Sequence, residues 1–185
     1  MQTTFESATD SEAMITRIAR HTFLKGLTHD QLALLADCAL RAKFEPGQII
    51  FREGEKAQVF YLIEKGEVVL ESGKEFGEPV VIQTIGAGDL LGWSWMMPPY
   101  VWHFSARAIK PTEAIYFAGT ILRDYCERDH SLGFELHKRM SEIMMTRLQA
   151  ARRKMLSIHA HGAKLQPAPH VSPFMEQEFD SPPPD

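Results

Sequence analysis

The sequence is poor in cysteine, in net charge and in long apolar runs, and each shortage excludes a class of protein. Its 185 residues include two cysteines, Cys38 and Cys126, too few for a disulfide framework and not by themselves a zinc site. Lys and Arg number 20 against 24 Asp and Glu, a net charge of −4 at pH 7, which excludes nucleic-acid binding through bulk charge. The longest stretch without Asp, Glu, Lys or Arg, Leu90 to Ala106, contains two prolines and is shorter than the roughly 20 apolar residues of a membrane helix.

The N-terminus has neither a basic start nor an apolar run, so the sequence predicts no signal peptide. Together with the low cysteine content, this favours a reducing, cytoplasmic location without membrane attachment. The chain is 44% hydrophobic and 24% charged, which is typical of a soluble globular domain. P-loop, zinc and nucleophile-elbow motifs do not occur. We therefore expect a protein that is not an enzyme, with no catalytic residues and no metal site.

Helical and strand patterns alternate along the chain in three blocks. Residues 11–20 and the segment after the Thr28–Gln31 capping box predict helices. From about Leu40 to Gly119, glycines separate short runs rich in β-forming residues, such as Val59–Ile63, a pattern typical of an antiparallel roll. Helical spacing returns over 120–128 and from Leu132 to Ile158.

These patterns predict an α+β fold, in which an antiparallel, jelly-roll-like β-roll is flanked by N-terminal helices and a long C-terminal helix. Residues 1–10 are expected to be flexible, residues 11–158 to form the domain, and the proline-rich residues 159–185 to be disordered. Phe174 and Phe179 lie among acidic residues of this tail, where a docking motif and an unstructured end are the two alternatives.

The long helix carries a possible dimer interface. Met144, Leu148, Ala151, Met155 and Ile158 are spaced by 4, 3, 4 and 3 residues, which is the heptad spacing of a coiled-coil seam. The alternative is that the helix packs only on its own domain. The two readings are compatible if residues 132–143 pack on the domain while the second half of the helix forms a homodimer.

The order of helices, glycine-punctuated roll and long helix resembles the cyclic-nucleotide-binding domain of CRP/FNR regulators. The matching segments are Leu24–Leu27, Phe44–Glu55, Phe60–Glu67 and Ile85–Gly92. In DNA-binding members a helix-turn-helix domain follows the long helix, whereas only a proline-rich segment follows here. The resemblance therefore implies the sensory part of such a regulator, with nucleic acid an unexpected partner and a separate output protein an expected one.

The phosphate-binding cassette departs from the family pattern. The resemblance implies a Gly-Glu pair that opens a short helix, followed by an Arg that neutralises the cyclic phosphate. Gly92 matches the glycine, but Trp93, followed by Ser94, stands at the Glu position. Trp102 or His103 stands at the Arg position.

A phosphate buried without a paired cation costs at least several kcal/mol, so the affinity for cyclic nucleotides should fall by orders of magnitude. Arg107 and Arg147 are the nearby cations that could replace the missing one, although Arg107 is as easily explained as a solvent-facing charge. Arg147 and Ala151 lie where the long helix would cover the pocket.

Three alternatives follow for the Trp-rich cassette. The pocket binds a flat, mostly apolar small molecule between Trp93 and Trp102, with His103 as a polar contact. Alternatively, the indoles fill the cavity and the chain is a ligand-free interaction or scaffold dimer. In the third alternative it still binds a cyclic nucleotide, as CRP/FNR transcriptional regulators do. The sequence identifies no certain cofactor, only a possible small-molecule or cyclic-nucleotide effector acting through the dimer helix.

Overall fold

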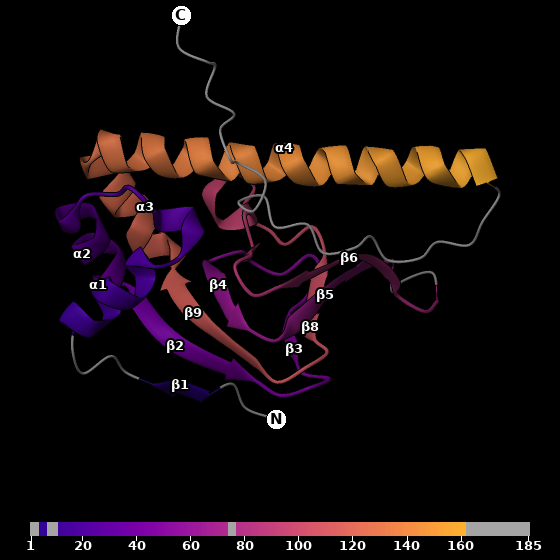
Figure 1. Cartoon of the computed structure of the whole chain (residues 1–185), viewed down its shortest axis with the longest axis horizontal. Helices are drawn as coiled ribbons and strands as arrows, with labels where there is room; N and C mark the ends of the chain where they lie inside the picture. The colour runs from indigo at the N-terminus through magenta and orange to yellow at the C-terminus, as the bar shows by residue number, and fades with distance from the viewer. Residues whose placement is uncertain (1–3, 7–10, 74–76, 162–185) are drawn as a thin grey trace, which may run out of the picture.

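A computed structural model describes residues 4–6, 11–73 and 77–161. The described segments fold into a β-roll with helices at one side and one long helix running along the molecule (Figure 1). The helical elements are α1 Ser11–Ala19, η1 Thr22–Leu24, α2 His29–Asp37, η3 Ser94–Met96, α3 Gly119–Arg128 and α4 His130–His161. The strands are β1 Thr4–Glu6, β2 Ala39–Phe44, β3 Ile49–Phe51, β4 Val59–Lys65, β5 Glu67–Ser72, β6 Val80–Gly86, β7 Leu90–Leu91, β8 Ser105–Ala108 and β9 Thr112–Ala118. The predicted α+β roll is confirmed.

Two antiparallel sheets form the roll. One has the strand order β1-β2-β9-β4-β7 and the other β3-β8-β5-β6. Their inner faces meet in one apolar cluster that includes Phe44, Tyr61, Leu70 and Trp102. The inside of the roll is therefore filled with side chains, as expected for a small closed sheet structure.

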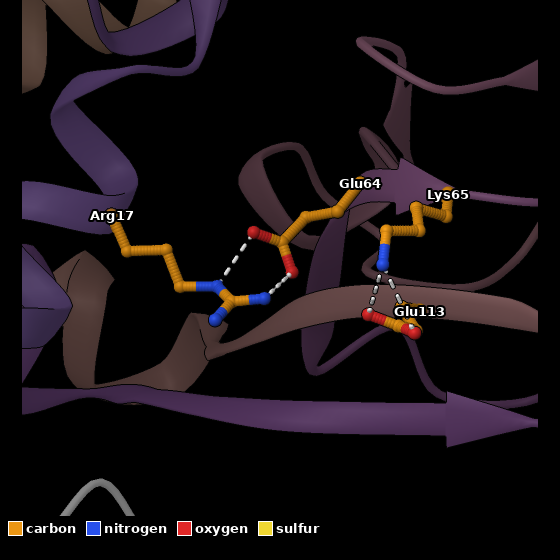
Figure 2. A network of polar contacts seen from close by, with 4 residues as sticks. All are labelled: Arg17, Glu64, Lys65 and Glu113. Carbon is orange, nitrogen blue, oxygen red and sulfur yellow. Dashed lines mark hydrogen bonds and ion pairs between the residues drawn. The ribbon is translucent and has the colours of Figure 1, made fainter.

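A second apolar cluster joins the helices to the outer face of the first sheet. Phe60 and Phe117 stack there at 4.5 Å between ring centroids, and Trp95 stacks on Phe60 at 5.1 Å. An ion pair also links α1 to β4. Arg17 of α1 donates to both carboxylate oxygens of Glu64 on β4 at 2.6 and 2.5 Å (Figure 2). The helices and the sheet are thus packed as one unit around these rings.

The connection between β4 and β5 shows why the roll needs a glycine there. Gly66 has a φ of +95°, and a Cβ at this position would lie 2.5 Å from the carbonyl oxygen of Pro111. Only glycine combines this backbone conformation with so close an approach of another chain segment.

Helix α4 has two different halves. Leu132, Leu136, Met140 and Ile143 are fully buried against the domain, which confirms the expected packing of the N-terminal half. In the C-terminal half, by contrast, the side chains of Leu148 and Met155 are 62% and 65% exposed. The second half of α4 therefore carries an apolar stripe that the described residues leave largely uncovered. None of the described helices has the length and apolar character to cross a membrane.

Three strands were not predicted. Thr4–Glu6 pairs with β2 and forms the outermost strand of the first sheet. The expectation that residues 1–10 are flexible is therefore wrong for these three residues. Strand β2 itself was missed because two of its four apolar residues are alanines and two of its six residues are charged, which is a weak strand signal. The two-residue strand β7 is too short to show any periodicity. Helix α4 also continues past Ile158 to His161, while the tail with Phe174 and Phe179 lies outside the described residues.

Candidate ligand-binding groove

A groove of about 580 Å³ lies between the second sheet of the roll and the C-terminal half of α4. Val80 and Ile82 of β6 form one wall, and Leu148 and Met155 of α4 form the opposite wall. Trp93 also lines the groove, from the segment between β7 and η3. This volume is in the range of small-molecule sites, which are also mostly apolar. The groove is the place where a ligand would contact the roll and the long helix together.

Of the residues that sequence reasoning selected for ligand binding, the groove gathers Trp93, Arg147 and Ala151. Trp93 is half-buried, and its ring lies 5.5 Å from the ring of the exposed His103. Four residues predicted for the dimer seam, Met144, Leu148, Ala151 and Met155, line the same groove. The side chain of Ile158 lies outside the described residues. One segment of α4 thus faces both the groove and solvent.

Trp102 is not a wall of this groove. Its indole stacks on Phe51 with 3.8 Å between ring centroids and an interplanar angle of 12°, and the residue is 3% exposed. Its backbone is fixed as well, because its N–H donates to the carbonyl oxygen of Glu55 and its carbonyl accepts from the N–H of Gly54. The expectation of facing Trp93 and Trp102 walls is therefore not met, since Trp102 belongs to the core of the roll.

Gly92 and Ser94 flank Trp93 but contribute no groove surface. Gly92 has a φ of +90°, and a Cβ there would lie 2.8 Å from Cη2 of Trp102. Ser94 is 1% exposed, and its Oγ is buried with no hydrogen-bond partner among the described residues. The start of the cassette is thus shaped around the buried indole of Trp102.

Arg107 is held away from the groove. Its Nε and Nη2 donate to the two carboxylate oxygens of Glu71 at 2.9 and 2.7 Å, and this hydrogen bonding raises the pKa of the guanidinium. The pair lies on strands β5 and β8, beside a separate, smaller depression. Because a bidentate pair satisfies both partners, Arg107 is not available to a ligand in the groove.

Arg147 is one of two cations, with Lys154, among the described residues that line the groove. Its Nη2 donates to the carbonyl oxygen of Leu90, while its Nη1 is buried and has no partner among the described residues. Burial lowers the pKa of the guanidinium, and the carboxylate of Asp89 partly offsets this effect. A guanidinium stays charged in proteins even so.

Sequence reasoning missed most of the sheet side of the groove. Val80 and Ile82 were recognised as strand residues, but not as side chains that face α4. A signal was present in the sequence, because two apolar residues two positions apart on a strand point to the same face. In the structure, Val80 and Ile82 are 51% and 42% exposed. Which strand face meets α4 is a matter of tertiary packing.

Comparison with known proteins identifies the fold. Residues 41–129, from β2 through α3, match the cyclic nucleotide-binding domain family. Human cGMP-dependent protein kinase 2 is 33% identical over 72 residues, which is 38% of this chain and 9% of the kinase. The chain thus spans about a tenth of the length of the curated relatives that it matches.

Solved structures agree with this family match. A protein from Geobacter metallireducens assigned to the cyclic nucleotide-binding proteins is 28% identical, with a TM-score of 0.66 over 72% of this chain and 96% of that one. The sensor domain of the transcriptional regulator DNR from Pseudomonas aeruginosa shares the fold at 19% identity, with a TM-score of 0.58 over 69% of this chain and 90% of that one. Residues 41–129 therefore form a domain of the cyclic nucleotide-binding family, and the structural neighbours of the chain include the sensor domain of a transcriptional regulator.

Proposed function

We propose that this chain is a non-catalytic sensor domain that binds a small molecule other than cyclic AMP or cyclic GMP in the groove between the roll and α4. The observation that carries the proposal is the chemistry of the groove. Its lining is mostly apolar, and among the residues that the structure describes its charged side chains are Arg147 and Lys154, with no Asp or Glu. The resemblance calls for a Glu to accept from the ribose hydroxyl, and the half-buried Trp93 stands in its place.

The groove supports a route from ligand to output. Leu148 and Met155 line the groove and also belong to the predicted heptad seam. A ligand that contacts these side chains therefore changes the surface that a second copy of the chain would bind. Ligand binding and dimerisation are then coupled through one helix, and each changes the affinity of the other. We propose a homodimer whose response passes to a separate output protein in the cytoplasm, with nucleic acid not expected as a partner. Residues 11–158 would form the sensing unit.

The filled roll favours a second candidate, a ligand-free interaction dimer. Trp102 and Phe51 occupy the interior with a 3.8 Å stack, and the core of the roll needs no ligand to complete it. In this case the groove would simply be part of the dimer interface.

The two candidates differ in a direct measurement. We expect calorimetry with cyclic AMP and cyclic GMP to show no submicromolar binding, and compounds that do bind to raise the melting temperature and change the fluorescence of Trp93. The Trp93→Phe variant should lose the fluorescence response, whereas Trp95→Phe should keep it, because Trp95 is buried in the other cluster. Submicromolar binding of a cyclic nucleotide would contradict the proposal. An unchanged melting temperature with every compound tested would favour the ligand-free dimer.

A further inference from the structure

Arg147 is a cation that is held in place and has one buried nitrogen without a hydrogen-bond partner among the described residues. The hydrogen bond from Nη2 to the carbonyl oxygen of Leu90 fixes the guanidinium at the groove. The buried Nη1 has no hydrogen-bond partner among the described residues. An unsatisfied buried donor is costly, and the cost is greater when the donor belongs to a charged group. A ligand acceptor that reaches the guanidinium from the groove would therefore be favoured.

The charges around Arg147 favour an anionic acceptor. Asp89 is the carboxylate that acts on the guanidinium, but it is 2% exposed and its Oδ2 accepts from the N–H of Gly86. It is not among the residues that line the groove. Lys154 is the other charged side chain of the lining, so both charges that the described residues present to a ligand are positive.

The rest of the groove favours an apolar ligand body. Leu70, Phe104 and Met144 extend the apolar walls described above, and Gln83 is the neutral polar side chain among the lining residues. Trp93 lines the groove at the same place, and an indole is a large, flat, mostly apolar group. A sugar with several hydroxyl groups would lose its water here without gaining enough partners.

We propose that the groove selects a monoanionic, largely apolar small molecule, a carboxylic acid with an alkyl or aromatic body, whose acidic group pairs with the guanidinium of Arg147. This inference rests on the proposed function, because it names the ligand class of the same groove. Cyclic nucleotides satisfy the requirement for an anion but not the requirement for an apolar body.

Octanoate and octan-1-ol test the inference, because they share the alkyl body and differ in the acidic group. We expect the full chain to bind octanoate roughly 10- to 100-fold more tightly than octan-1-ol in calorimetry, the range for one hydrogen bond to a charged group. Arg147→Gln should remove this preference by weakening octanoate binding and leaving octan-1-ol unchanged. Arg153→Gln, an exposed position on the same helix, should behave like the wild type.

The outcomes separate this inference from the proposed function. Equal affinities of the wild type for the acid and the alcohol would overturn the inference and leave the apolar groove as a binding site. Binding of neither compound would count against both. Displacement of octanoate by a lower concentration of cyclic AMP would overturn the ligand class. Arg147→Lys keeps the charge and should retain part of the preference, which provides a second variant if Arg147→Gln does not fold by circular dichroism.

Discussion

Replacing Gly92 with alanine tests the central packing feature of the cassette, the buried indole of Trp102. Two separate costs are expected. The φ of +90° at Gly92 is a conformation that costs an ordinary L-residue about 1–2 kcal/mol. In addition, the new Cβ would lie 2.8 Å from Cη2 and 2.9 Å from Cζ3 of Trp102. The indole cannot move away freely because it stacks on Phe51 at 3.8 Å.

The steric cost can be isolated with a matched glycine. Overpacking a core typically costs 1–3 kcal/mol, so Gly92→Ala should lower the free energy of unfolding by about 2–5 kcal/mol in total. Gly47 has a φ of +85°, and nothing lies within 4 Å of a Cβ built there. Gly47→Ala should therefore cost only the backbone component, about 1–2 kcal/mol.

Urea unfolding followed by far-ultraviolet circular dichroism measures both variants without relying on tryptophan fluorescence. A double-mutant cycle with Trp102→Phe, which removes the two crowded ring atoms, should recover about 1–3 kcal/mol of coupling between positions 92 and 102. If Gly92→Ala is no more destabilising than Gly47→Ala, or if the coupling is zero, then the placement of Trp102 under Gly92 is refuted.

Three further predictions concern the dimer, pH and the thiols. Leu148→Asp places a charge in the exposed apolar stripe of α4 and should yield a folded monomer by light scattering; a persistent dimer would contradict the seam. His21 has a pKa lowered by burial to about 4 from 6.5, so the unfolded chain takes up its proton first as the pH falls. The contribution of neutral His21 to the free energy of unfolding is present above pH 6.5 and should fall by about 1–3 kcal/mol as the pH drops towards 4. His21→Asn should flatten this part of the plot of unfolding free energy against pH, measured by urea unfolding. Burial raises the pKa of Cys38 to about 12 and of Cys126 to about 11, so neither thiol should react rapidly with iodoacetamide at pH 7, and labelling before unfolding would show that the packing around them is looser.

Strand prediction succeeded where β-branched and aromatic residues are concentrated and failed where they are sparse. Val59–Ile63 lies within β4, and Val68–Leu70 lies within β5, because such side chains suit a pleated, half-buried surface. In β2, Ala42 and Phe44 are buried while Arg41 and Lys43 alternate with them. That alternation is a strand pattern, but the small alanine carries little of the signal, and pairing with β9 supplies the stability instead.

The candidate site was predictable in composition but not in arrangement. The sequence places Trp93, Trp102 and Arg107 in one cassette, and nothing local distinguishes the two indoles. The two indoles lie in different places because Phe51, which comes from a different strand, stacks on Trp102 in the core of the roll. Arg107 is likewise removed from the site by Glu71, 36 residues away along the chain.

The order of residues along the chain was enough to predict a glycine-punctuated roll and a long helix with one buried face. Those features follow from local periodicity and residue type, which act over a few positions. The absence of the usual acidic and basic anchors from the cassette came from the resemblance to the family. Only the tertiary structure decided that one indole fills the core, that the other lines an open groove, and that Arg147 lines the same groove with a buried nitrogen that has no partner among the described residues. Such choices depend on which side chains from distant segments pack together, and close packing of shapes and charges is a property of the folded chain as a whole.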